Sequence, residues 1–283
     1  MYRVFIDGSA GTTGLKIFQR FTQRNDIELL QIDEAKRKDV SERVRMIEMA
    51  DISFLCLPDA ASKEICALVS PTAKILDTST AHRTSPDWVY GFPELSAEQR
   101  SKVETATRVA VPGCHASGFI ATVLPLVEAG ILPKDYPLSA HSVTGYSGGG
   151  KQMIASYDDE NRDLGYNSPR QYGFTQQHKH LPEMVNMTGI ENAPVFNPIV
   201  ADYMAGMVVT VPLHTKFLAK KVTPQDVADV LKKHYANQRF IHVMEANVTP
   251  DDGMLCSNKL AETNDMELYV YGNDDRICIA ARY

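Results

Sequence analysis

A single cysteine stands where the sequence favours a reactive thiol. Cys114 lies in the stretch 111–119, after an apolar segment that Pro112 and Gly113 end and before a helical pattern of apolar residues. We therefore expect Cys114 in the first turn of a helix, where free backbone N–H groups and the helix dipole favour a thiolate. Such a position lowers a cysteine pKa from about 8.5 to roughly 3.5–7.5, which predicts a nucleophile. The alternative is a small, buried, apolar cysteine.

Two histidines form a second candidate group. His178 and His180 are two residues apart in a polar stretch, with Glu183 close behind them. Histidine titrates near neutral pH, so the pair offers a general acid or base and a contact for a polar substrate. No other cluster of histidine or cysteine completes a set of metal ligands, and we predict no metal site. A structural histidine is the alternative.

A glycine-rich turn opens the chain. Residues 2–7 are typical of a strand and residues 15–21 of a helix, and between them glycines stand at positions 8, 11 and 14. This is a variant of the dinucleotide fingerprint, in which glycine permits positive φ and a close approach of the backbone to a pyrophosphate. An ordinary tight turn is the alternative. We predict that a dinucleotide binds to this turn, which comprises Gly8, Ser9, Ala10, Gly11, Thr12, Thr13 and Gly14.

The second strand is predicted at residues 27–32, and the charged residues that follow it bear on the choice of cofactor. NAD enzymes place an acidic residue near this point to bind the ribose 2′-hydroxyl, and Asp33 and Glu34 could serve. Lys36, Arg37 and Lys38 follow at once and could bind a 2′-phosphate instead. These residues leave NAD and NADP open.

Strands alternate with helices through the first 113 residues. Strands are predicted at 51–58 and 73–79, and helices at 40–50 and 60–69, which indicates a parallel, doubly wound sheet. Ligands bind beyond the carboxyl ends of such strands, so Pro58 and Ser79 join the predicted cofactor site. Arg83, just past one of these ends, is a candidate anion clamp, and a surface ion pair is its alternative.

The second half of the chain is richer in strands. A second glycine-rich loop, residues 145–151, lacks the spacing of a phosphate-binding P-loop and could bring Ser147 to a substrate. A polar stretch, 161–176, is predicted to be a loop. A mixed or antiparallel sheet is expected from strands at 138–144, 195–200, 206–213, 241–244, 258–262, 266–271 and 276–281. We expect one domain of residues 1–113 and a second of residues 114–283.

Composition excludes several classes of protein. A chain of 283 residues with 44% hydrophobic and 23% charged residues is long enough for two ordinary globular cores. Its net charge is −6 and it has no basic block, so we expect no nucleic-acid partner. We also expect no membrane span and no leader peptide. The five cysteines form no C-x-x-C pair, which favours a reducing cytoplasm over a disulfide framework.

Four motifs together resemble those of the N-acetyl-gamma-glutamyl-phosphate reductase family in its short form (type 2). They are Gly8–Gly14, the segment 111–118 around Cys114, the loop 145–151 and the segment 178–183. The resemblance implies a two-domain fold like that of glyceraldehyde-phosphate dehydrogenase, with a Rossmann-type first domain. It implies NADPH-dependent reduction of N-acetyl-gamma-glutamyl phosphate to the semialdehyde, with phosphate released, in arginine biosynthesis. A homo-oligomer, a dimer or tetramer, is also implied.

The resemblance assigns roles to the candidate residues. Cys114 would form a thioester with the substrate, and an acid–base group would move the proton when the thiohemiacetal collapses. His180 is expected to be that group and His178 a substrate contact, although the reverse order stays open. Arg83 is expected to bind phosphate, and Ser147 and Gly148 to contact the substrate. The family continues with a glycine-rich loop and a helix that returns to the cofactor domain, and both are expected to be absent from this chain.

Two other functions are alternatives to the reductase that the resemblance implies. An enzyme like aspartate-semialdehyde dehydrogenase would use the same chemistry on another substrate. A dinucleotide-sensing module would bind the cofactor with an idle cysteine, and replacement of Cys114 would leave its behaviour intact.

Overall fold

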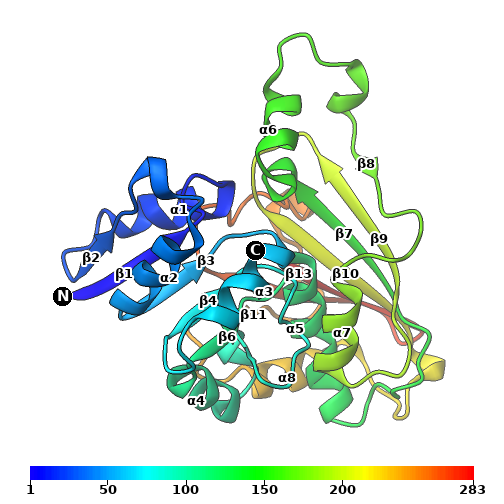
Figure 1. Cartoon of the computed structure of the whole chain (residues 1–283). Helices are drawn as coiled ribbons and strands as arrows, with labels where there is room; N and C mark the ends of the chain where they lie inside the picture. The colour runs from blue at the N-terminus through cyan, green and yellow to red at the C-terminus, as the bar shows by residue number, and fades with distance from the viewer. The chain divides into compact units, whose positions relative to one another are not determined.

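The computed structural model describes residues 1–283, with the side chain of Asp251 excepted. The chain folds as two compact units (Figure 1). Unit 1 comprises Met1–Pro93 and Glu98–Gly113, and unit 2 comprises Glu94–Ala97 and Cys114–Tyr283.

Unit 1 is built on a six-stranded sheet in which every paired strand is parallel. The spatial order is β2-β1-β3-β4-β6-β5, so the strand order reverses between β1 and β3. In open sheets of this kind the ligand binds outside the carboxyl ends of the strands at such a reversal. The predicted doubly wound sheet is confirmed. Its strands are β1 (Tyr2–Asp7), β2 (Ile27–Leu30), β3 (Ile52–Leu55), β4 (Ile75–Asp77), β5 (Val89–Tyr90) and β6 (Arg108–Ala110).

Helices pack on this sheet through apolar side chains. Phe5 of β1, Leu55 of β3 and Ile75 of β4 meet helix residues such as Ile47 and Ile65 in one buried cluster. This packing fixes the strand ends that carry the predicted site. The helices are α1 (Thr12–Phe21), α2 (Val40–Met49), α3 (Asp59–Leu68) and α4 (Ala97–Thr105), with the 3₁₀ turn η1 (Glu34–Lys36). A second 3₁₀ turn, η2 (Pro93–Leu95), begins at Pro93 and continues into the residues of unit 2.

Unit 2 contains a seven-stranded mixed sheet in the order β11-β12-β13-β10-β7-β9-β8. The pairs β7–β9 and β11–β12 are parallel, and the other four pairs are antiparallel. The predicted mixed sheet is confirmed. The strands are β7 (Ser139–Gly145), β8 (Arg170–Gln171), β9 (Val195–Ala201), β10 (Met207–His214), β11 (Ile241–Val243), β12 (Met266–Gly272) and β13 (Arg276–Arg282).

One helix occupies the middle of unit 2. Helix α5 (Cys114–Glu128) contacts β10 and β13 of the sheet and two other helices, α7 (Leu181–Thr188) and α8 (Pro224–His234). Helix α8 begins with a threonine cap, because Thr223 and Asp226 form a reciprocal capping box. The remaining elements are α6 (Gly150–Asp158), η3 (Tyr146–Gly149), η4 (Leu164–Asn167), η5 (Thr215–Phe217) and η6 (Asp251–Gly253).

Two local predictions for unit 2 are wrong. Residues 258–262, predicted as a strand, form turns, and Glu262 has a φ of +68°, which breaks extended pairing. The polar stretch 161–176 contains η4 and β8, and the segment that follows the histidines is helix α7. No helix in the described part of the chain combines the length and apolarity that a membrane crossing requires.

Candidate active site

Glycine shapes the turn between β1 and α1. Gly8 has a φ of +85°, and a Cβ there would stand 2.4 Å from the carbonyl oxygen of Cys56. A Cβ on Gly14 would stand 2.3 Å from the carbonyl oxygen of Gly8, and Gly11 donates its N–H to that same oxygen over 2.8 Å. No other residue fits at positions 8 and 14 without moving the backbone. The turn therefore brings the start of α1 against the end of β1.

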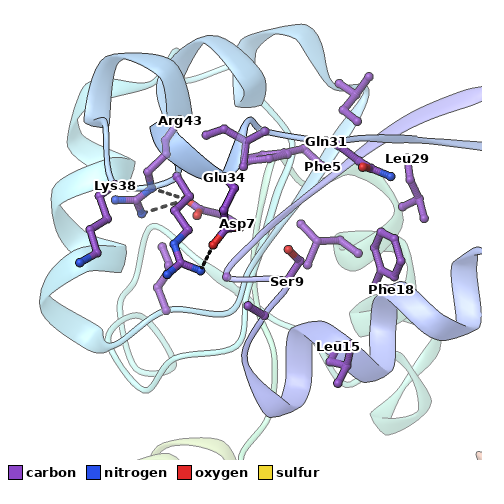
Figure 2. A pocket seen from close by; sticks show the side chains of 17 residues that line it. Phe5, Asp7, Ser9, Leu15, Phe18, Leu29, Gln31, Glu34, Lys38 and Arg43 are labelled. Atoms are coloured by element: carbon purple, nitrogen blue, oxygen red, sulfur yellow. Dashed lines mark hydrogen bonds and ion pairs between the residues drawn. The ribbon is translucent and has the colours of Figure 1, made fainter.

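A pocket of about 660 Å³ opens at this turn (Figure 2). Gly8, Ser9 and Ala10 line it on the side of the turn. Gly11 is the N-cap of α1, and Thr12, Thr13 and Gly14 form its first turn. The opposite wall is formed by residues that follow β2, namely Gln31, Ile32, Glu34, Arg37 and Lys38.

A buried ion pair forms another part of the wall. Arg43 of α2 donates from Nε to Oδ2 of Asp7 over 2.9 Å, and its Nη2 lies 2.8 Å from the same oxygen (Figure 2). Burial raises the pKa of Asp7, and Arg43 opposes that rise. Sequence reasoning missed both residues. The only available signal was a carboxylate in the last position of the strand before the turn.

The loop after β4 is held by buried Asp77. Its carboxylate accepts the Ser79 hydroxyl over 2.6 Å and lies 2.7 Å from Nδ1 of His82, whose ring stacks on Trp88. Arg83 donates to the carbonyl oxygens of Val111 (2.9 Å) and Thr78 (3.0 Å). The predicted anion clamp is thereby tied to the segment that leads into Cys114. Pro58, at the end of β3, is the N-cap residue of α3.

Cys114 is the first residue of α5 and is exposed. The predicted helix start is therefore confirmed, and a buried apolar role for Cys114 does not fit its exposure. The positive end of the helix dipole lies at this residue and can stabilise negative charge on the sulfur.

The next residue, His115, turns inward and joins a hydrogen-bonded group. Its Nδ1 lies 2.7 Å from the hydroxyl of Ser142 in β7, and its Nε2 lies 2.7 Å from the hydroxyl of Tyr172. His115 is only 3% exposed. Both ring nitrogens are satisfied, because a neutral imidazole has one donor and one acceptor.

The predicted histidine pair packs against His115. Ring centroids of His178 and His180 lie 5.3 and 5.4 Å from that of His115, and 4.7 Å from each other. His180 is 4% exposed and Glu183, one turn into α7, is 1% exposed. We call His115, Tyr172, His178 and His180 the imidazole cluster. Sequence reasoning missed His115, Ser142 and Tyr172 as members of this site.

Ser147 and Gly148 follow β7, the strand that carries Ser142. Ser147 donates its N–H to the carbonyl oxygen of Met204 over 3.0 Å, and Gly148 is exposed with open space around its Cα. The hydrogen bond of Ser147 is thus made to the loop that precedes β10. Among the described residues, no group of three or more His, Cys, Asp or Glu side chains has an arrangement that could hold a metal ion.

The buried His115 predicts a pH dependence of stability. Burial, helped by the nearby His178 and Lys179, lowers the pKa of His115 from 6.5 to about 3. Between these values the unfolded chain binds a proton that the folded chain excludes, so stability falls as the pH is lowered through this window. Within this window, each unit of pH changes the free energy of unfolding by at most about 1.4 kcal/mol. Between pH 7 and pH 5, the titration of His115 should lower the free energy of unfolding by about 2 kcal/mol.

Urea unfolding at pH 7 and pH 5 measures this effect. The wild type should lose about 2 kcal/mol more between the two pH values than His115→Asn loses. The matched control is His141→Asn, because His141 is an exposed histidine of β7 and should keep the wild-type difference. An equal loss in His115→Asn and the wild type would contradict the prediction.

Comparison with known proteins agrees with this architecture. Residues 3–103 match the family described as semialdehyde dehydrogenase, NAD binding domain, and residues 114–283 match the semialdehyde dehydrogenase dimerisation domain. The solved structure of aspartate semialdehyde dehydrogenase from Francisella tularensis has a TM-score of 0.70 at 11% identity, covering 100% of this chain and 94% of that one. The enzyme from Candida albicans, solved with NADP, has a TM-score of 0.65 at 13% identity, over 99% and 93% of the two chains. At such identities the likeness shows the fold alone.

Sequence relatives are more specific. The N-acetyl-gamma-glutamyl-phosphate reductase of Sinorhizobium medicae is 44% identical over 275 residues, which are 96% of this chain and 89% of the relative. N-acetyl-gamma-glutamyl-phosphate reductase 2 of Nostoc sp. is 40% identical over 281 residues, covering 96% and 87%. By these similarities, and with a nicotinamide-dinucleotide domain followed by a dimerisation domain, the chain belongs to the N-acetyl-gamma-glutamyl-phosphate reductase family.

Proposed function

We propose that this chain reduces N-acetyl-gamma-glutamyl phosphate to N-acetylglutamate semialdehyde with NADPH, releasing phosphate, as a step of arginine biosynthesis in the cytoplasm. The observation that carries the proposal is an exposed cysteine at the first position of α5 whose neighbour, His115, lies in the imidazole cluster. The names of relatives that match along 96% of the chain support the choice of substrate.

The chemistry begins at Cys114. Its thiolate attacks the carbonyl carbon of the acyl phosphate, the carbon–oxygen bond to phosphate breaks, and a thioester with Sγ remains. N–H groups at the start of α5 favour both the thiolate and the oxyanion that forms during attack. When bound, the dinucleotide supplies the hydride that brings a thioester to the aldehyde level.

Proton transfer falls to the imidazole cluster. His180 gives a proton to the alkoxide of the reduced thioester, which becomes the thiohemiacetal hydroxyl, and takes it back as the aldehyde forms and the thiolate leaves. His178 contacts the substrate. Arg83 binds the phosphate group with its guanidinium, which is the side chain best suited to an oxyanion. Ser147 and Gly148 contribute contacts from the loop after β7.

The pocket of unit 1 fits a dinucleotide. Gly8 and Gly14 let the start of α1 pack against the strand ends, because Cβ atoms there would collide with carbonyl oxygens. The start of a helix in this position is where a pyrophosphate binds. Pro58 follows β3, the parallel neighbour of β1, and Ser79 follows β4, which pairs with β3 on its other side. These residues would hold the cofactor.

The wall beyond β2 supports NADP over NAD. Strand β2 ends at Leu30, and Gln31, rather than an acidic residue, follows it in the wall. The carboxylate of Asp33 accepts the N–H of Ala35 over 2.9 Å, and Glu34 forms an ion pair with Arg37 at 2.6 Å. Arg37 and Lys38 line the pocket, so a 2′-phosphate would meet positive charge there.

Replacement of Lys38 should separate the two cofactors. We expect Lys38→Ala to weaken NADPH binding about tenfold or more and to leave NADH binding within about twofold, because only NADPH carries a 2′-phosphate that can lose a charged contact. The matched control is Lys36→Ala, which removes the same charge from a residue of the same run that is not among those lining the pocket. Fluorescence titration gives both affinities. Equal weakening of NADPH and NADH in Lys38→Ala would contradict the assignment.

The reverse reaction tests the whole proposal. The purified protein should reduce NADP with N-acetylglutamate semialdehyde, and the rate should depend on added phosphate. Aspartate semialdehyde is the control substrate, since the fold is shared with dehydrogenases of that substrate. Turnover of aspartate semialdehyde without turnover of N-acetylglutamate semialdehyde would contradict the proposal. The match of residues 114–283 to a dimerisation domain supports a homodimer or a tetramer, which light scattering of the same sample would distinguish.

A further inference from the structure

A hydroxyl group enters the first turn of α5 from a residue distant in sequence. Gly118 donates its N–H to the hydroxyl oxygen of Tyr283 over 3.1 Å, and that hydroxyl donates to the carbonyl oxygen of Cys114. In an ideal α-helix the N–H of residue 118 bonds to the carbonyl of residue 114. The Tyr283 hydroxyl thus bridges the two backbone groups that close the turn carrying the nucleophile.

Gly118 makes the room for this bridge. A Cβ at position 118 would lie 2.8 Å from both Cε1 and the hydroxyl oxygen of Tyr283, and 2.9 Å from Cβ of Val209. Glycine inside a helix costs about 0.5–1 kcal/mol relative to alanine. Here glycine is required, because a larger residue would collide with the tyrosine ring.

The sheet, rather than the helix, fixes the tyrosine. Tyr283 donates its N–H to the carbonyl of Met207 over 3.0 Å, and Met207 donates back to the carbonyl of Tyr283 over 2.8 Å. The preceding Arg282 is 1% exposed and bonds to Glu267 of β12. The hydroxyl is therefore a fixed point against which the start of α5 is held.

The same hydroxyl remains a donor at working pH. Burial, followed by the charge of Cys114, raises the pKa of Tyr283 well above its ordinary value. The charge of Cys114 also adds to the effect of burial in raising the pKa of Tyr172. Both tyrosines are thus close enough to Cys114 to sense its ionisation.

We propose that Tyr283 is a positioning residue for the nucleophile. Its hydroxyl sets the orientation of the first peptide group of α5, and through it the direction in which the Cys114 side chain leaves the helix. Without the hydroxyl, the carbonyl of Cys114 and the N–H of Gly118 lose the partner that they share, so the peptide after Cys114 can turn and move Sγ. The inference rests on the proposed role of Cys114.

Tyr283→Phe keeps the ring and removes only the bridge. We expect kcat to fall about 10- to 100-fold, with KM for the cofactor within about twofold, since a small displacement of a reacting group has effects of this size. The midpoint of Cys114 alkylation by iodoacetamide against pH should also move by about half a unit or more. The matched control is Tyr235→Phe, because Tyr235 donates its hydroxyl to a carbonyl of the same helix, that of Ala121, over 2.8 Å. That variant should keep the wild-type midpoint and kcat.

The alkylation is measured without substrate, by mass spectrometry of the peptide that contains Cys114. Its outcome is therefore independent of which semialdehyde the enzyme reduces, and failure of the reverse reaction would refute the proposed function alone. Gly118→Ala is a second route to the same change, since it displaces the ring, and it should also shift the midpoint. A wild-type midpoint in both Tyr283→Phe and Gly118→Ala, or equal shifts in Tyr283→Phe and Tyr235→Phe, would overturn the inference.

Discussion

Replacing Cys114 with serine should reduce turnover by about 10⁴-fold or more, while the affinity for NADPH stays within about twofold of the wild type. A serine hydroxyl at the start of α5 stays protonated at neutral pH, so the attacking anion is lost although the side chain keeps nearly the same size. The cofactor pocket is lined by residues of unit 1, which the substitution does not touch. Steady-state kinetics of the reverse reaction and a fluorescence titration with NADPH measure the two quantities.

The chain offers a matched cysteine for this experiment. Cys256 is exposed, like Cys114, and Cys256→Ser should retain wild-type kcat. Burial raises the pKa of Cys56 and of Cys66 to about 11, so these thiols should not compete for alkylation near neutral pH. Persistence of substantial turnover in Cys114→Ser would contradict the thioester route. That result would instead favour a dinucleotide-sensing role, in which Cys114 takes no part in catalysis.

The sequence predicts best those features that depend on local geometry. The turn at Gly8–Gly14 could be recognised because only glycine tolerates its positive φ and its close contacts with Cys56. The start of α5 at Cys114 followed from Pro112 and Gly113, which end an extended segment. Alternation of strand and helix implied the parallel sheet of unit 1 for the same local reasons.

What the sequence could not show are contacts between distant segments. His115 lies in α5, Ser142 in β7 and Tyr172 directly after β8, and β7 and β8 are joined only through β9, which pairs with both. The bridge from Tyr283 to α5 depends on strand pairing at Met207. Helix α7 was hidden for another reason. Its buried residues Leu181, Met184 and Thr188 have helical spacing, but polar and histidine residues just before them are typical of a loop.

The structure also bears on the order of the two histidines, because one hydrogen bond fixes which ring nitrogen of His178 carries its proton. The backbone N–H of His180 donates to Nδ1 of His178 over 3.2 Å. Burial lowers the pKa of His178, with a further contribution from Lys179, so its imidazole is held neutral. With Nδ1 accepting, the single proton of His178 is on Nε2, and the ring presents a donor. A fixed donor suits contact with a substrate oxygen better than proton abstraction, which supports His180 as the acid–base group.

His180→Asn should therefore lower kcat by about 10²- to 10⁴-fold, the range in which general acid–base catalysis contributes, with little change in KM. His178→Asn is the matched variant, since it makes the same substitution two residues away in the same cluster, and it should act mainly by raising KM. Asparagine retains a polar side chain of smaller size in each case, so the packing change is similar. Initial rates over a range of substrate concentration, between pH 6 and pH 9, separate the two effects. If His178→Asn lost kcat and His180→Asn lost only affinity, the roles would have to be exchanged, while the thioester at Cys114 would be unaffected.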